Sequence, residues 1–313
     1  MSNFLISFNV VFPIALMMAL GFFIKKIKLL NETSVKQMNN VVFRVFLPIM
    51  IFKNVYDSEV SEVFEPKLVI FAVVAVVCSI LLIFAIVPIF EKQNSRRGVL
   101  IQAIFRSNFV IFGIPVTAAL CGETVTGAAS VLIAIIIPLF NFAAVISLEV
   151  FNGNKPNFLK ILKGIATNPL IIASVLALLV NFIGIELPNV IEKSISNVST
   201  VTTPLALIIL GASINFSSVG KNALRITLGA AAKLLILPAI CLSIAAFGFG
   251  FRGAELSILL SLFASPPAVS SFTMAQQMGG DDELACQLVM FGTVASIFTM
   301  FIWIFIIMQL RLI

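Results

Sequence analysis

The sequence predicts an all-α integral membrane protein with ten transmembrane helices, arranged as an inverted repeat of two five-helix halves. Three observations support this prediction. The 313 residues are 60% hydrophobic and only 11% charged, a composition typical of polytopic membrane proteins rather than of soluble domains. The hydrophobic residues form ten runs, each close to the twenty residues that a bilayer requires. Two runs in corresponding positions of the two halves are interrupted by polar residues and proline.

Short polar connections separate the ten runs. In chain order the runs cover residues 4–24, 35–55, 67–90, 97–121, 125–148, 167–184, 188–214, 222–249, 254–278 and 284–309. The first run has no basic leader before it, so we expect a retained helix rather than a cleaved signal. Polar residues are most frequent in the second and seventh runs, which indicates helices that face protein rather than lipid.

The basic residues predict the orientation of these helices. Twelve lysines and arginines lie in the odd-numbered connections, and five lie in the even-numbered connections and the termini. Because basic loops stay in the cytoplasm, both termini are expected outside the plasma membrane. A cytoplasmic linker, 151–166, divides the chain into a first half, 1–150, and a second half, 167–313. Five helices per half reverse the orientation of the second half, so the repeat is inverted.

The fourth run contains the first interruption, Arg106-Ser107-Asn108, followed by Gly113-Ile114-Pro115. Pro115 lacks an N–H and crowds the turn before it, while Gly113 lets the backbone leave helical geometry. We therefore expect the carbonyls near 110–113 to lose their partners. Free backbone at membrane depth is tolerated only where protein buries it or where it lines a wet cavity. The alternative is an ordinary proline kink with Arg106 snorkelling to the interface.

The ninth run contains the second interruption, which extends from Ser265 to Ser271 and includes Pro266-Pro267. Paired broken helices in corresponding positions of two halves indicate the binding site of a secondary transporter. The predicted substrate-binding residues are Arg106, Asn108, Gly113, Ile114, Pro115, Ser265, Pro266, Pro267, Ser270 and Ser271.

Three basic residues, Arg44, Arg106 and Lys233, lie inside runs, whereas the acidic residues lie in connections or at the ends of runs. Buried cations without carboxylates need another anion, and a negatively charged substrate would supply it. Asn108 is the leading candidate, because an amide can donate two hydrogen bonds to a carboxylate and release it again. The alternative for Asn108 is interhelical hydrogen bonding. For Arg44 and Lys233, binding helix carbonyls or reaching the interface is as expected as a role in binding the anion.

Several other functions do not fit this sequence. The chain has no histidine, which excludes histidine proton relays and Ser-His catalysis, and its four cysteines include no close pair. We predict no enzyme activity, no catalytic residues, no metal, no cofactor and no nucleic-acid partner. A sodium site made of carbonyls and hydroxyls around Ser265, Ser270, Ser271 and Thr273 stays open.

The sequence resembles the auxin efflux carrier family, bacterial branch, which includes permeases for malate and malonate. The matching elements are Asn108-x4-Gly113-Ile114-Pro115, Ser265-Pro266-Pro267-Ala268, Leu47-Pro48 and the ten-run layout. The resemblance implies that Asn108 binds the substrate carboxylate and that Pro115 and Pro266 are the prolines at which the broken helices cross. It also implies a dimerising scaffold from runs one, two, six and seven. Runs three to five and eight to ten would form a transport domain that moves as an elevator.

This sequence departs from plant members of that family in three respects. It lacks their long central loop, it has no acidic residue within 67–90, and its second break has two adjacent prolines. These departures disfavour auxin as substrate, and the resemblance implies a small organic anion such as malate or malonate and a homodimer in the lipid bilayer. The alternatives are a sodium-coupled organic-anion symporter, an anion channel, and a membrane-embedded enzyme or sensor.

Overall fold

The computed structural model describes residues 2–58, 65–121, 126–152 and 158–313. Within these ranges all regular structure is helical, and strand-like pairing is limited to an isolated antiparallel bridge between Ser107 and Pro267. The all-α prediction is therefore confirmed for the described part of the chain.

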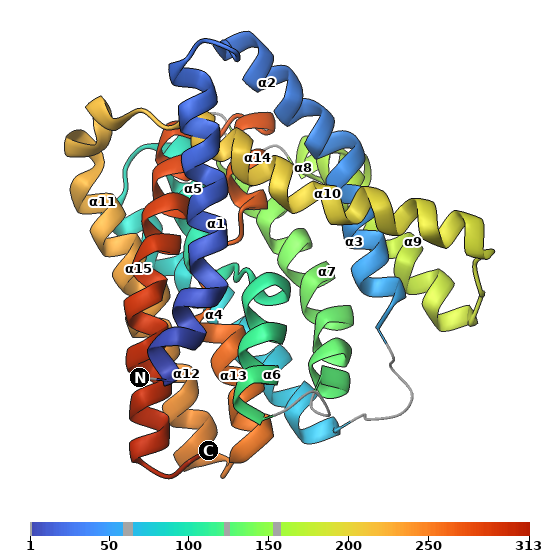
Figure 1. Cartoon of the computed structure of the whole chain (residues 1–313), viewed down its shortest axis with the longest axis vertical. Helices are drawn as coiled ribbons and strands as arrows, with labels where there is room; N and C mark the ends of the chain where they lie inside the picture. The colour runs from blue at the N-terminus through green and yellow to red at the C-terminus, as the bar shows by residue number, and fades with distance from the viewer. Residues whose placement is uncertain (1, 59–64, 122–125, 153–157) are drawn as a thin grey trace.

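The helices of the first half are α1 Ser2–Lys26, α2 Glu32–Val41, η1 Val42–Phe46, α3 Leu47–Tyr56, α4 Pro66–Phe90, α5 Asn94–Phe105, η2 Phe109–Gly113, α6 Ile114–Cys121 and α7 Thr126–Val150. The remaining helices are α8 Phe158–Ala166, α9 Pro169–Ile183, α10 Asn189–Ser213, η4 Phe216–Ser218, α11 Val219–Ala231, η5 Ala232–Ile236, α12 Leu237–Ser243, η6 Ile244–Gly248, α13 Gly253–Ala264, α14 Ser270–Gln277 and α15 Asp282–Gln309. Figure 1 shows α1 and α15 side by side along one flank, with α9 at the opposite flank.

Several of these helices could cross a bilayer. Among the described residues, five helical segments are long and apolar enough to do so: Pro66–Phe90, Ala128–Val150, Asn189–Ser213, Val219–Gly248 and Asp282–Gln309. Three shorter apolar segments are Phe109–Cys121, Pro169–Ile183 and Gly253–Ala264. The architecture is that of a helical membrane protein, and the count of ten spans stays a prediction.

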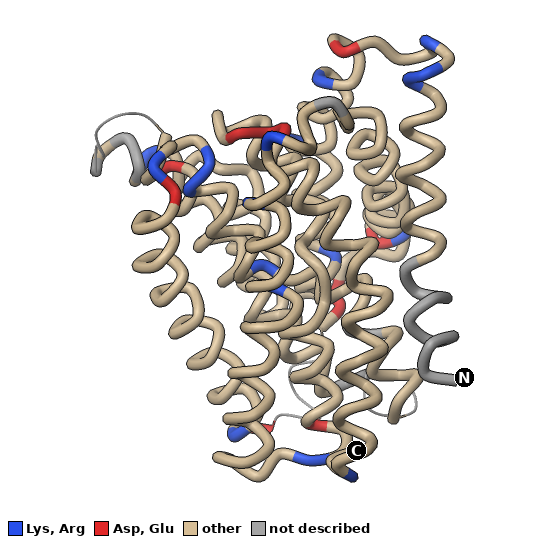
Figure 2. Tube along the Cα trace, turned by 90° about the vertical axis from the view of Figure 1, so that its left-hand side faces the viewer, with Lys and Arg blue, Asp and Glu red and all other residues tan. Residues whose placement is uncertain are grey.

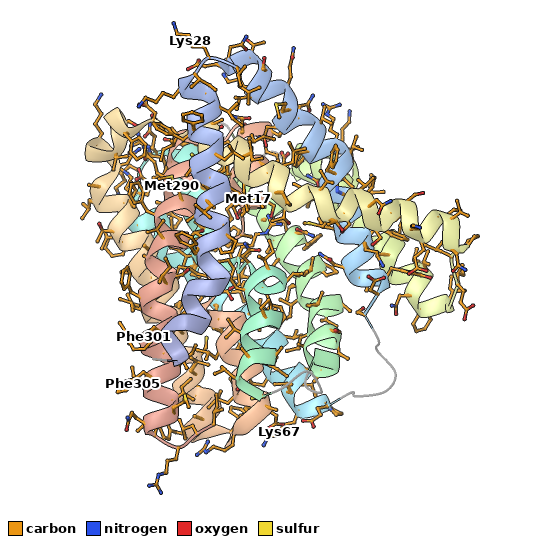
Figure 3. The ribbon with its side chains drawn as sticks, in the orientation of Figure 1. Met17, Lys28, Lys67, Met290, Phe301 and Phe305 are labelled. Carbon is orange, nitrogen blue, oxygen red and sulfur yellow. The ribbon has the colours of Figure 1, made fainter. Side chains whose placement is uncertain are left out.

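Charge is distributed as a membrane protein requires. Figure 2 shows most lysines, arginines, aspartates and glutamates near the two ends of the molecule, with few between them. In Figure 3, Lys28 lies at one end and Lys67 at the other, while Phe301 and Phe305 lie on the half of α15 nearer to Lys67. The apolar region between the charged ends is the part of the molecule that would contact lipid.

Proline produces a recurrent local structure in this fold. The π turns η1 and η5 each end two residues before a proline, Pro48 and Pro238 respectively. A proline ring displaces the carbonyl four residues before it, and a wider π turn accommodates that displacement. Leu234 carries the carbonyl displaced by Pro238, and this oxygen accepts a hydrogen bond of 2.8 Å from Trp303 Nε1.

Small residues allow α1 and α10 to approach closely. A Cβ atom on Gly21 would overlap the carbonyl oxygen of Ile208, and a Cβ on Gly211 would overlap that of Met18. Such glycine contacts are a usual means of packing helices in a bilayer. The α3 helix packs on α9 in the same bundle. Run one therefore packs against run seven, and run two packs against run six. Each of these helices pairs with a helix of the other half, as two inverted halves would produce.

Candidate functional site

The two predicted breaks meet at one point of the molecule. After α5 ends, Arg106 adopts an extended conformation (φ −81°, ψ 113°), and after α13 ends Ser265 does the same (φ −62°, ψ 147°). The Asn108 N–H donates to the Pro266 carbonyl at 2.9 Å, and the Ala268 N–H donates to the Arg106 carbonyl at 3.3 Å. Each break therefore satisfies backbone groups of the other, as unwound backbone inside a membrane protein requires.

The first interruption is shorter than the stretch from Arg106 to Pro115 that the sequence analysis identified. Residues 109–121 are helical and begin with the π turn η2, so the helix resumes before Pro115; the expectation that carbonyls near 110–113 lose their partners stays a prediction. That turn ends two residues before Pro115, as η1 and η5 do before their own prolines. It therefore accommodates the ring without an open break. The interruption itself is Arg106–Asn108, where backbone groups bond to the other break.

Arg106 is buried, with 5% of its surface exposed. Its Nη2 donates to Asn141 Oδ1 at 2.5 Å, and its Nη1 lies 2.5 Å from Met274 Sδ. The amide of Asn141 in turn donates to Ser174 Oγ at 3.3 Å. Both guanidinium contacts are neutral, and no ion pair joins Arg106 to a carboxylate within the described residues. The snorkelling alternative does not fit this position, because neighbouring helices enclose the guanidinium.

Asn108 presents an unused hydrogen-bond donor. The residue is 8% exposed, and its buried Nδ2 has no hydrogen-bond partner in the structure. Buried polar atoms in proteins are nearly always paired, so an unpaired amide nitrogen requires an explanation. The interhelical-bonding alternative does not supply a partner for this nitrogen. A ligand oxygen would supply it, since an amide donates readily to a carboxylate.

A cavity of about 220 Å³ lies directly beside these two residues. It is bounded by the breaks, by α3, by α7 and by α10. Its polar lining consists of Asn54, Arg106, Ser107, Asn108, Asn141, Ser199, Thr200, Thr203 and Ser270, and its apolar lining includes Leu47, Met50, Ile51, Phe109, Val110, Ile111, Ile137, Phe140 and Ala268. A concave pocket that combines apolar walls with convergent polar groups is the usual form of a small-molecule site.

A sequence model of a family described as membrane transport protein matches residues 6–304. The chain belongs to this family, the auxin efflux carrier family. The resemblance stated above is thereby confirmed, and the protein is a multi-pass membrane transporter. Its cavity at the crossing is the natural place to look for the substrate of such a carrier.

Relatives of this carrier match over almost its full length. It is 26% identical over 309 residues to the uncharacterized transporter MJ1031 of Methanocaldococcus jannaschii, covering 96% of this chain and 98% of the relative. It is 24% identical to an uncharacterized transporter of Methanothermobacter thermautotrophicus, with 96% and 98% covered. It is 20% identical to the uncharacterized transporter YfdV of Escherichia coli, with 94% and 95% covered.

The predicted site residues of the carrier divide into three groups. Arg106, Asn108 and Ser270 line the cavity. The residues of the second break, Ser265, Pro266 and Pro267, form the crossing instead, and Ser265 Oγ donates to the Ser261 carbonyl at 2.5 Å.

Of the remaining predicted residues, the described side chains of Ser271 and Pro115 are not part of the cavity lining. Ser271 is buried with an unpaired Oγ, while its carbonyl accepts from Gln102 Nε2 at 3.0 Å. Pro115 is exposed. The surroundings of Gly113 and of the Ile114 side chain lie outside what the structure describes.

Sequence reasoning missed several residues of the cavity wall. Asn141 is an isolated amide within an apolar run, and that isolation was a signal that could have identified it. Ser199, Thr200 and Thr203 belong to the polar stretch of the seventh run, which was predicted to face protein but was not assigned to a site. All four residues line the cavity.

The other two cations inside runs have different surroundings. Lys233 is fully buried, and its Nζ donates to Ser107 Oγ and to the Phe263 carbonyl, the latter at 3.4 Å. One helix carbonyl therefore accepts from Lys233, in line with the expectation that it binds helix carbonyls, and its second partner is a hydroxyl. Arg44 is exposed on the protein surface. In the part of the chain that the structure describes, no group of three or more Cys, Asp or Glu residues is placed to hold a metal ion.

Proposed function

We propose that this carrier moves a small organic anion, a carboxylate such as malate or malonate, across the plasma membrane by alternating access. The observation that carries the proposal is the unpaired amide of Asn108 beside the buried guanidinium of Arg106, both facing one cavity. The amide would donate to a carboxylate oxygen. The guanidinium would supply the positive charge that makes entry of an anion favourable.

The neutral surroundings of Arg106 support an anionic rather than a cationic substrate. Its two contacts, to Asn141 and Met274, compensate none of its charge. A buried charge without a partner is costly, and a bound carboxylate would remove that cost. The helical segment that begins at Phe109 and the α14 helix both begin at the crossing, so their positive dipole ends add to the same preference.

An elevator-type step fits the position of the cavity. Its walls come from α3 and α10, which belong to the proposed scaffold, and from the two breaks and α7, which belong to the proposed transport domain. A displacement of the breaks past α3 and α10 would expose the cavity to opposite sides in turn. The orientation predicted from the basic residues, with both termini outside, belongs to this proposal.

The exposed faces of α9 and α10 are the surfaces on which we place the contact of the proposed homodimer. Large apolar residues are exposed along them, including Leu176, Leu179, Phe182, Val190 and Val201. In a bilayer these side chains contact either lipid or a second copy of the same scaffold. Blue native electrophoresis and cross-linking in the membrane would decide between the two arrangements.

Uptake into proteoliposomes tests the proposal. We expect saturable flux of radiolabelled malate or malonate, competed by other carboxylates, and nearly abolished by Asn108→Ala. Asn197→Ala is the matched control, because Asn197 is exposed on α10 and does not line the cavity. Absence of wild-type flux for a broad carboxylate panel would refute the organic-anion proposal. Conductance far above carrier turnover would favour a channel.

A further inference from the structure

We propose that Lys233 is a built-in cation of the crossing, standing where a coupling sodium ion would otherwise bind, so that transport by this carrier does not depend on sodium. This inference rests on the proposed function for its transport consequence. Its structural part states that the ammonium of Lys233 occupies a cation position. This part is argued from the geometry of the second break alone.

The negative end of α13 provides that position. Three carbonyls in the last turn of α13, those of Ser261, Leu262 and Phe263, accept hydrogen bonds from side chains rather than from a continuing helix. The donors are Ser265 Oγ, Ser107 Oγ and Lys233 Nζ, respectively. Free carbonyls and the dipole of a helix C-terminus favour a positive charge. Half-helix C-termini and unwound carbonyls are the groups that bind the sodium ion in transporters with broken helices.

Within the described residues, no carboxylate balances the positive charge of the Lys233 ammonium. Lys233 is fully buried, forms no ion pair there, and does not line the cavity. Its Nζ contacts two oxygens, Ser107 Oγ and the Phe263 carbonyl. Oxygen ligands from a hydroxyl and a carbonyl are also those that sodium would use. The lysine and a sodium ion would therefore compete for the same groups.

The backbone around Lys233 holds the ammonium in place. Lys233 lies on the π turn η5, whose wider turn is accommodated before Pro238. The Leu234 carbonyl released by this turn accepts the Trp303 indole N–H. The ammonium on this turn is a permanent part of the protein, whereas a bound sodium ion would exchange with ions in solution.

The hydroxyls that the sequence analysis considered as sodium ligands are less suitable for a cation than the end of α13. Ser265 is engaged with the Ser261 carbonyl. Ser271 Oγ and Thr273 Oγ1 are buried and unpaired, but they lie near the start of α14. The positive end of that helix disfavours a cation.

Thermal unfolding of the purified full chain in sodium chloride and in choline chloride tests the structural part. We expect the wild-type midpoint to be the same in both salts. Lys233→Ala should lower the midpoint and leave a space lined by oxygens, so sodium but not choline should partly restore it. Lys233→Met should lower the midpoint without a sodium response, because its apolar chain fills that space. Arg44→Ala is the control, since it removes an exposed cation from another π turn.

Flux measurements test the transport part. Wild-type uptake should be equal with external sodium or choline, and Lys233→Ala should reduce uptake in choline on the order of tenfold or more. A sodium-dependent rise in the wild-type midpoint or in wild-type flux would overturn the inference. So would a folded Lys233→Ala protein that is as stable as wild type and indifferent to sodium. The unfolding measurement needs no substrate, so absence of flux for all carboxylates would refute the proposed function alone.

Discussion

The two breaks cross with similar backbones but carry different chemistry. The first break places Arg106 and Asn108 on the wall of the cavity, with a charge and an unpaired amide nitrogen. The second break directs Ser265 back onto its own helix, and its crossing residues Pro266 and Pro267 lack N–H groups. Its positive charge is supplied from outside by Lys233.

The difference shows that two helices with similar breaks can have separate tasks. A backbone crossing needs only carbonyls and N–H groups from each side, and both breaks provide them. Recognition of a ligand needs side chains directed into a cavity, and the first break contributes more polar ones than the second, Arg106, Ser107 and Asn108 against Ser270. Substitutions at the first break should therefore change substrate affinity, whereas those at the second should change stability or the geometry of the crossing.

The largest effect on transport is expected from a substitution at the first break, Asn108→Ala. Asn108→Ala removes an amide that we expect to donate to a carboxylate, and hydrogen bonds to charged groups contribute about 1.5–3 kcal/mol. Uptake of malonate at low concentration should fall by roughly 10–150-fold. An increase in KM, with an unchanged thermal midpoint, would place the loss in binding.

The next effect concerns the charge at the first break. Arg106→Lys keeps a positive charge but loses the planar group that contacts Asn141 and Met274 together. We expect affinity for a dicarboxylate to fall about tenfold, from the loss of roughly 1.4 kcal/mol. Competition of labelled malonate uptake by unlabelled malonate measures this change. Equal affinity in the two proteins would show that the geometry of the guanidinium is not used.

A substitution behind the second break tests whether this break acts through geometry. A Cβ atom on Gly292 would lie 2.9 Å from Pro267 Cδ, so Gly292→Ala should displace the crossing. Overpacking of this kind costs about 1–3 kcal/mol, which thermal unfolding would detect as a lower midpoint. Gly220→Ala is the matched control, because a Cβ there meets nothing within 4 Å. An unchanged midpoint for Gly292→Ala would mean that the crossing adapts freely.

A smaller effect is expected at Ser265, which the sequence analysis assigned to the substrate. Ser265→Ala removes one buried hydrogen bond to the Ser261 carbonyl, with an expected cost of about 1 kcal/mol in the free energy of unfolding. Uptake should stay close to that of wild type. A loss of affinity as large as that of Asn108→Ala would break the proposed division between the two breaks.

The smallest effect lies outside both breaks, at Glu91. Burial alone would raise the pKa of this carboxyl, but the hydrogen bond and charge of Arg225 lower it below 4.5 on balance. The contribution of the pair to stability is therefore present above pH 4.5 and is lost as the pH falls through the lowered pKa. The difference in thermal midpoint between wild type and Glu91→Gln should shrink over that acidic range. A constant difference would contradict the assignment.

The sequence predicted the helical fold and the existence of both breaks because hydrophobic run length, proline and isolated polar residues are local signals. It did not predict that the helix resumes at Phe109, since a π turn can accommodate Pro115 and no local pattern announces that. It did not identify Asn141 as a partner of Arg106, and it did not decide the role of Lys233. Those contacts join residues 35 and 126 positions apart, and only packing of the helices brings them together.

Ligand-induced stabilisation of the purified protein tests the central claim most directly. Malonate and its neutral analogue malonamide would be titrated into wild type, Asn108→Ala and Ser265→Ala while the thermal midpoint is measured. We expect malonate, but not malonamide, to raise the midpoint of wild type and of Ser265→Ala, and neither compound to affect Asn108→Ala. Stabilisation of Asn108→Ala by malonate equal to that of wild type would contradict the assignment of the first break as the anion site.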